Sequence, residues 1–190
     1  QKFLFVLSAA RFGTHWRMKM KLLDTTGGNA KLKKSDKSSQ EYRLAGLSLM
    51  PDDILCPYRN VAGCAKSCLE SLTNFEKLCK RQGVKAAVRL NVLSDIPWEK
   101  HGIPQEFPDI FFYDYTKNAS RLGKTPSNYE LMFSYSNEPA YQKVVVKALR
   151  SDVPMSVVFR NGMPKYYKGR RVIDGDASDL VNVKAGKVIV

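Results

Sequence analysis

The sequence lacks the signatures of several common enzyme classes. It contains no P-loop, no glycine-rich dinucleotide fingerprint, no G-x-S-x-G nucleophile elbow and no H-E-x-x-H zinc-protease motif. Each of those chemistries depends on the geometry of its motif, so the corresponding enzyme classes are disfavoured. Histidine and cysteine are also scarce, with two and four residues respectively, which leaves few candidates for soft metal ligands.

Long apolar runs are missing as well. The first ten residues, QKFLFVLSAA, combine a lysine, an apolar run of eight and small residues, as a secretory signal would. Arg11 and Arg17 follow directly, however, and a run of eight is far below the roughly 18 residues that span a bilayer. We therefore expect a cytoplasmic protein without a membrane span. In a reducing cytoplasm, clustered cysteines more often bind metal than form disulfides.

Acidic residues are few relative to basic ones. The chain of 190 residues holds 31 Lys and Arg against 18 Asp and Glu, a formal net charge of +13. Residues 1–43 carry ten basic and three acidic side chains. We therefore divide the chain into a basic N-terminal arm, residues 1–43, and a single α/β domain, residues 44–190. A surplus of this size favours a polyanionic partner such as nucleic acid, although a solvated tail is the plain alternative for the arm.

Predicted strands and helices alternate after the arm. Residues 69–82 have apolar side chains three and four apart, the period of an amphipathic helix, and Gly83 ends it. Helices are also predicted at 139–149 and, shorter, at 118–122. Strands are predicted at 42–50, 85–90, 109–114, 128–134, 153–159, 171–174 and 186–190. Residues 27–39 are polar, basic and rich in small side chains, which predicts a mobile loop or hairpin.

This alternation predicts right-handed βαβ units and a mainly parallel sheet. The fold class is therefore α/β, and we expect a partial or distorted TIM-like barrel with the basic arm ahead of it. An open sheet remains the alternative.

Polar side chains follow six of the predicted strands, where the loops of a parallel α/β fold converge on a ligand. Asn, Asp and Ser also cap helices and form turns, which is the simpler explanation for some of them. The candidate acid, base or electrostatic groups are Asp95, Glu99, Lys117 and Asp176. The candidate cofactor-binding residues are Asn91, Ser94, Tyr115, Thr116 and Ser134.

Three cysteines form the most specific pattern in the chain. The segment CPYRNVAGCAKSC places Cys56, Cys64 and Cys68 in a C-x7-C-x3-C spacing. Thiolates suit zinc, copper(I) and iron–sulfur clusters, and structural zinc usually takes four ligands, often in C-x2-C pairs. Neither such a pair nor a nearby histidine is present, so a [4Fe–4S] cluster with one iron left open is favoured. Zinc, or no metal with a disulfide or free thiols, are the alternatives, and Cys79 is expected to be a buried core thiol.

Seven segments occur in a characteristic order: GNAKL (28–32), LAGLSLMP (44–51), CPYRNVAGCAKSCL (56–69), VRLNVLSDIPWE (88–99), FPDIFFYDYTK (107–117), NYELMFS (128–134) and VIDGDASDL (172–180). Together they resemble the conserved blocks of the phage gene product 88 family. The resemblance implies a phage- or prophage-encoded cytoplasmic viral protein and brings no established activity. The shared positions that it implies are Asn29, Lys31, Cys56, Cys64, Cys68, Arg89, Asn91, Ser94, Asp95, Trp98, Glu99, Tyr113, Asp114, Tyr115, Thr116, Lys117, Ser134, Asp174, Gly175, Asp176 and Asp179.

This chain departs from the family pattern in one place. Relatives carry a longer basic helical insert between Cys68 and Lys85, where this chain has only SLTNFEKLCKRQGV at 71–84. A looser architectural analogy links the chain to radical S-adenosylmethionine enzymes, which place a three-cysteine loop after the first strand of a partial barrel. The spacing of the cysteines differs from theirs, so this likeness is one of architecture alone.

We predict from these patterns a phage-encoded iron–sulfur protein with redox or radical chemistry and a small-molecule ligand at the cluster. The alternative is a nucleic-acid-binding phage protein with a structural zinc site, which would contact phosphates through the basic arm and its lysines Lys31, Lys33, Lys34 and Lys37. A third class is a metal-independent hydrolase or phosphate-handling enzyme. It would use the carboxylates of Asp95, Glu99, Asp174, Asp176 and Asp179.

Overall fold

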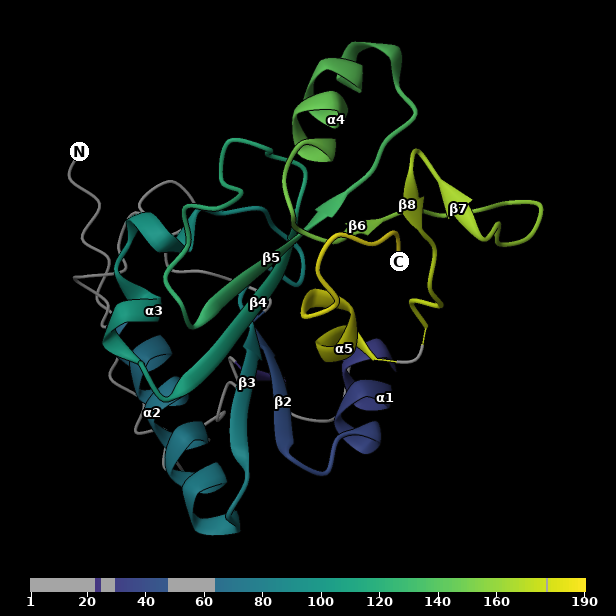
Figure 1. Ribbon diagram of the computed structural model, residues 1–190. Coiled ribbons are helices and arrows are strands. Elements are labelled where there is room, and N and C mark those ends of the chain that lie inside the picture. Colours follow the sequence, from purple (N-terminus) through teal and green to yellow (C-terminus); the bar gives the residue numbers. More distant parts are fainter. Residues whose placement is uncertain (1–22, 25–29, 48–63, 177) are drawn as a thin grey trace, which may run out of the picture.

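A computed structural model describes residues 23–24, 30–47, 64–176 and 178–190, without the side chains of residues 24, 31, 38, 64–68 and 181 (Figure 1). One sheet contains β1 (Leu23–Asp24), β2 (Tyr42–Leu47), β3 (Lys85–Arg89), β4 (Ile110–Thr116), β5 (Tyr129–Ser134) and β6 (Met155–Ser156), in that order. β1 pairs antiparallel with β2, and β2 to β6 pair in parallel. The predicted α/β fold with a parallel sheet of βα units is therefore confirmed. No closed barrel is found within the described ranges.

Helices cover both faces of this sheet. The helical elements are α1 (Ala30–Ser38), α2 (Cys64–Gln82), η1 (Trp98–Lys100), α3 (Ile103–Glu106), η2 (Pro139–Tyr141), α4 (Gln142–Leu149) and α5 (Asp179–Val183). In Figure 1, α2 and α3 lie on one side of the sheet, and α1 and α5 lie on the other. No helix in the described part of the chain is long and apolar enough to cross a bilayer.

The core is divided by the sheet because successive strand residues face opposite sides. On one side, Leu72, Phe75 and Cys79 of α2 pack with Phe112 of β4. On the other, Leu32 of α1 and residues of α5 pack with Tyr113 of β4. Both faces of the central strands are therefore buried, as expected for the near-continuous apolar sequence of β4.

The principal elements lie where the sequence predicts them. α2 extends the predicted helix 69–82 back to Cys64, and Gly83, with φ of +66°, follows its last residue. β3, β4 and β5 lie within two residues of the predicted strands. β2 begins at the predicted Tyr42 and extends to Leu47, and residues 48–50 of that prediction lie outside the described residues. The strands predicted at 171–174 and 186–190 are much shorter than expected. In their place, Ile189 forms single parallel bridges to Met155 and Val172. β6 likewise contains only Met155 and Ser156 of the predicted strand 153–159.

The prediction of a mobile loop or hairpin at 27–39 was wrong, because residues 30–38 form helix α1. Tertiary packing stabilises this polar segment as a helix, since Leu32 is buried against the sheet and the buried Ser35 hydroxyl accepts a hydrogen bond from the Asp179 amide of α5. Gly46 of β2 permits this close approach of α1 to the sheet. A Cβ at this position would overlap Leu32 Cδ1 and lie 2.8 Å from Val92 Cγ2.

The prediction of a short helix at 118–122 was also wrong. Asn118 Oδ1 instead accepts hydrogen bonds from the Ser120 amide at 3.0 Å and the Ser120 hydroxyl at 2.7 Å. The Asn118 amide in turn donates to Thr116 Oγ1 at 3.0 Å. The two bonds that join a side-chain oxygen to a backbone amide compete with a helical hydrogen-bond pattern, so the segment forms a turn. The turn places Arg121 over the carboxyl end of the sheet.

Candidate functional site

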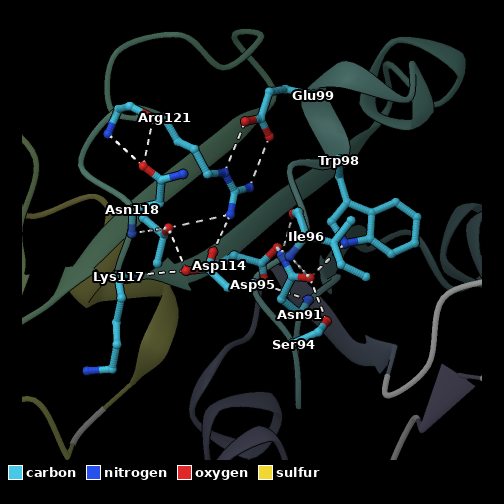
Figure 2. Close-up of polar contacts among 12 residues, drawn as sticks. Asn91, Ser94, Asp95, Ile96, Trp98, Glu99, Asp114, Lys117, Asn118 and Arg121 are labelled. Carbon is cyan, nitrogen blue, oxygen red and sulfur yellow. Dashed lines mark hydrogen bonds and ion pairs between the residues drawn. The ribbon is translucent and has the colours of Figure 1, made fainter. Parts of the chain in front are cut away.

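Asn91 is the centre of a buried hydrogen-bond network just beyond the end of β3 (Figure 2). It is 1% exposed. Its Oδ1 accepts hydrogen bonds from Ser94 Oγ at 2.8 Å, the Ile96 amide at 3.0 Å and Trp98 Nε1 at 2.9 Å. Its Nδ2 donates to the Ile96 carbonyl at 3.0 Å. Because a carboxamide both donates and accepts, this one side chain closes the loop after β3 and orients Trp98 in the core.

Asp114 of β4 attaches this loop to the neighbouring strand. Its Oδ1 accepts from the Asn91 amide at 2.6 Å, and its Oδ2 accepts from Asn91 Nδ2 at 3.0 Å and the Tyr129 hydroxyl at 2.7 Å. Complete burial raises the pKa of Asp114 to about 7, although Tyr129, the Asn91 amide, Arg89 and Arg121 all favour the ionised form. A carboxyl group that titrates near neutral pH therefore lies at the carboxyl edge of the sheet.

Arg121 is a buried cation held by two acidic side chains. It is 3% exposed. Its Nε and Nη2 donate to Glu99 Oε1 and Oε2, each at 3.0 Å, and its Nη1 donates to Asp95 Oδ1 at 2.5 Å. Nη2 also donates to the Tyr129 hydroxyl at 2.9 Å, which links Arg121 to Asp114. The bidentate geometry matches the planar fork of guanidinium to a carboxylate.

Asp95 extends the network to the end of β4. Its Oδ2 accepts from Thr116 Oγ1 at 3.0 Å and from the Lys117 amide at 2.8 Å. The Lys117 ammonium lies away from this carboxylate, 5.9 Å from the ring centroid of Tyr141. The structure therefore brings together Asn91, Ser94, Asp95, Glu99 and Thr116, five of the predicted site residues, with the backbone of a sixth, Lys117. Their predicted roles in acid–base chemistry and cofactor binding stay predictions.

A second polar group occupies the opposite face of β4. The Tyr115 hydroxyl donates to Asp179 Oδ1 at 2.9 Å, and Arg89 Nη1 lies 3.8 Å from Asp179 Oδ2. The guanidinium carbon of Arg89 is 4.7 Å from the Tyr115 ring centroid, a cation–π arrangement. Burial, together with the charge of Asp179, raises the pKa of the Tyr115 hydroxyl, so this phenol remains protonated. The Asp179 amide donates to Ser35 Oγ of α1 at 3.0 Å, which ties α5 to α1.

Tyr115 also lines a cavity of about 330 Å³ at the carboxyl end of β6. Ser156, Phe159, Asp174 and Asp176 contribute to its wall. This volume is at the lower end of the range for small-molecule sites. Two predicted residues, Tyr115 and Asp176, thus share one cavity. Ser134, the last predicted cofactor-binding residue, ends β5 directly opposite Ser156.

The predicted metal ligands lie outside the side chains that the structure describes. Cys56 falls in the undescribed segment 48–63, whereas the backbones of Cys64 and Cys68 form the start of α2, about one turn apart. Cys79, also on α2, is 1% exposed in the core, and burial raises the pKa of its thiol. Among the described side chains, no group of three or more His, Cys, Asp and Glu is placed to hold a metal ion. The iron–sulfur and zinc predictions therefore stay predictions.

Sequence reasoning did not identify Arg121 and Tyr129 as members of the site. Arg121 lies in a segment rich in Asn, Ser and Gly that was predicted as a helix, and Tyr129 begins a strand. The sequence does contain one signal for Arg121. Two acidic residues, Asp95 and Glu99, follow β3, and if the loop after β3 is buried they need a cation nearby.

Comparison with known proteins relates most of the chain to one family. The family model described as Gene product 88 matches residues 69–190. Neither the curated proteins nor the solved structures gave a match. The matched segment contains the Asn91–Asp114–Arg121 network and the Tyr115 cavity, and it begins directly after Cys68.

We expect Arg121→Met to reduce the free energy of unfolding by about 3 kcal/mol or more, because the largely buried carboxylate of Glu99 would lose its counter-ion. Adding Glu99→Gln should recover part of this loss, so the pair should be non-additive in a double-mutant cycle measured by urea unfolding. Arg81→Met, at an exposed position of α2, is the matched control and should change stability little. Equal effects of the two single arginine variants would contradict the proposed importance of the buried pair.

We expect Asp114→Asn to remove a pH dependence of stability. The pKa of an aspartate is about 4 in the unfolded chain, and that of Asp114 is about 7 in the folded protein. The folded state therefore binds more protons between these values, and this stabilisation is lost as the pH rises from about 4 to about 7. Urea unfolding across this range should show that stability falls with rising pH more steeply in the wild type than in the variant.

The exposed Asp152→Asn substitution should leave the wild-type slope unchanged. If the difference in unfolding free energy between wild type and Asp114→Asn were constant with pH, the assignment of the titration to Asp114 would be wrong.

Proposed function

This chain belongs to the phage gene product 88 family, and from that premise we propose that it is a phage-encoded iron–sulfur protein of the host cytoplasm. Its cofactor is a [4Fe–4S] cluster on Cys56, Cys64 and Cys68. The cluster leaves one iron open to a small-molecule ligand and serves redox or radical chemistry. When bound, it supplies the electron-transfer or ligand-activating step, and the residues of the chain position the ligand.

The observation that carries this proposal is the position of α2. β2 ends at Leu47 and α2 begins at Cys64, so the three cysteines lie between the carboxyl end of a parallel strand and the first turns of the following helix. The Val92 amide donates to the Leu47 carbonyl at 3.3 Å, which joins the end of β2 to the loop of Asn91. The described end of β2, which the cysteine segment follows in the chain, therefore lies at the edge of the sheet where the polar network lies, which is the edge that carries ligand-binding loops in parallel α/β folds.

The start of α2 also suits thiolate ligands. A helix N-terminus carries partial positive charge, which stabilises anions, and the thiolate is the form of cysteine that binds metal. No acidic residue in the first turn of α2 competes with this effect. Cys79, by contrast, lies in the core with Leu72 and Phe75. These differences support ligation by the cysteines near the start of α2 and a structural role for Cys79.

The Tyr115 cavity is a candidate small-molecule site within this proposal, on the β6 side of the sheet, whereas the cysteines follow β2. Its lining includes Tyr115, Ser156, Asp174 and Asp176, whose side chains carry hydroxyl and carboxylate groups. The Arg89 guanidinium lies over the Tyr115 ring, and Asp179 accepts a hydrogen bond from the Tyr115 hydroxyl. The orientation of this side chain is therefore set before a ligand binds. A partial TIM-like barrel belongs to the same proposal. The sequential order of β2 to β6 supports a partial barrel, whereas α1 and α5 lie on the face that a closed barrel would fill with side chains alone, so the proposed barrel stays open on that side.

Anaerobic purification and reconstitution should give a brown protein with iron, sulfide and broad absorbance near roughly 400 nm, typical of thiolate-ligated clusters. Cys64→Ser should lose the absorbance and most of the iron. Cys79→Ala is the matched control and should retain both, because that thiol is buried in the core. A colourless wild-type protein with stoichiometric zinc after this treatment would overturn the cluster assignment.

A nucleic-acid-binding protein with a structural zinc site is the second candidate. Lys33, Lys34 and Lys37 are all exposed on α1, so the helix presents a row of cations to solvent. The formal net charge of +13 provides the long-range attraction that such binding requires. Under this candidate the cysteines hold zinc, with a fourth ligand supplied from elsewhere.

The second candidate predicts that the protein binds labelled duplex DNA at low salt and releases it as salt increases. Lys33→Ala/Lys37→Ala should weaken binding and reduce the slope of log K against log salt by about 0.9 for each lost phosphate contact. Lys77→Ala/Arg81→Ala is the matched control, because it removes two exposed cations with the same spacing on α2. Equal effects of the two double variants would show that α1 has no specific role.

A further inference from the structure

The β7–β8 hairpin is a strongly basic element that neither candidate function uses. It consists of β7 (Tyr166–Tyr167) and β8 (Arg170–Arg171), and Figure 1 shows it projecting from the side of the molecule that carries the C-terminus. The stretch 153–173, which includes the hairpin, contains five basic residues and no acidic one. Arg160, Lys165, Lys168 and Arg171 are exposed, and Arg170 is buried.

The inner face of the hairpin is firmly attached to the domain. Arg170 is 3% exposed and donates hydrogen bonds to four carbonyls around the end of α4: those of Ala148 at 3.3 Å, Leu149 at 2.9 Å, Ser151 at 2.7 Å and Val153 at 2.7 Å. Tyr167, directly opposite Arg170, packs edge-on against Phe159 and Tyr135, with ring centroids 5.2 and 5.8 Å apart. The hairpin is therefore a rigid platform whose other face, with Tyr166 and Arg171, is exposed.

The outer face presents an aromatic ring beside a cation. Tyr166 is directly opposite Arg171, and both side chains point away from the Tyr167–Arg170 face because strand residues alternate. Tyr166 is 69% exposed, which is unusual for a tyrosine attached to so rigid an element. Side chains of directly opposed residues lie about 5 Å apart at Cβ. This spacing places a guanidinium within reach of a phosphate whose base stacks on the ring.

The turn of the hairpin retains a cation at a strained position. Lys168 has φ of +48° and Gly169 has φ of +77°, the left-handed pair of a type I′ turn. Asn or Gly would adopt the first position with less strain, so the lysine is not explained by the turn geometry. Its ammonium lies 5.5 Å from the Tyr167 ring centroid and 5.7 Å from that of Tyr135, which holds the charge close to the hairpin.

We propose that the outer face of the β7–β8 hairpin binds single-stranded nucleic acid. A base stacks on Tyr166, and the adjacent phosphate pairs with Arg171. Stacking platforms flanked by cations are the usual means of binding single strands without strong sequence preference. A membrane-inserting hairpin would instead place apolar side chains at its tip, where this one has Lys168 and Gly169. The inference rests on nucleic acid as the partner of the second candidate, and it is independent of α1 and of the cysteines.

Fluorescence anisotropy of the full chain with a labelled oligothymidylate of about 20 nucleotides tests this inference. Tyr166→Ala should weaken binding about tenfold, and Tyr166→Phe should retain it, because stacking needs the ring and not the hydroxyl. Arg171→Ala should weaken binding and reduce the salt slope by about 0.7, the value for one phosphate contact on a single strand. The exposed Arg81→Ala is the charge-matched control and should bind as the wild type does.

Three outcomes would overturn the inference in distinguishable ways. Unchanged binding by Tyr166→Ala and Arg171→Ala, with loss in Lys33→Ala/Lys37→Ala, would reject the hairpin and leave the second candidate intact. The absence of wild-type binding to oligothymidylate or duplex DNA at low salt would reject both. Binding to vesicles of equimolar phosphatidylcholine and phosphatidylserine, lost in Tyr166→Ala and without oligothymidylate binding, would assign the hairpin to a membrane surface.

Discussion

Burying Arg121 imposes a strict electrostatic condition on the carboxyl edge of the sheet. A cation that is 3% exposed is tolerated only if its charge and its donors are satisfied nearby. Glu99 and Asp95 provide the charge, and Tyr129 passes the network on to Asp114 and Asn91. Two connections that are separate in sequence are thereby held together, the one that follows β3 and the one that joins β4 to β5. The positions of Trp98, Thr116 and the Lys117 backbone follow from this arrangement.

Strand alternation then separates two environments on β4. Asp114 faces the Arg121 network, and Tyr113 and Tyr115 face α1 and α5, where Asp179 and Arg89 lie. The first environment is fully hydrogen-bonded and largely closed to solvent, which suits a positioning role. The second opens into the cavity beside Asp176, which suits ligand binding. The division explains why predicted site residues from one strand, Tyr115 and Thr116, belong to different groups.

The sequence predicted the sheet well because periodicity is a local property. The apolar run of β4 and the three- and four-residue spacing in α2 arise from burial on a face, so they are visible in the chain alone. Short elements were predicted poorly. α1 has a polar sequence and owes its helix to contacts with Gly46 and Leu44, and α5 is fixed by the bond from Asp179 to Ser35. Local propensity carries little information about such contacts.

The sequence by itself determined the α/β class, the order of the main strands, the family and the cysteine spacing, because these depend on composition and on residues close together in the chain. Only the tertiary structure decided which polar residues meet. Asp95 and Glu99 had been expected as available carboxylates, and the fold pairs both with Arg121, more than twenty residues further on. Tyr166 and Arg171 gained significance only when the hairpin set them side by side. A long-range ion pair or a strand register depends on three-dimensional distance, which a one-dimensional pattern does not record.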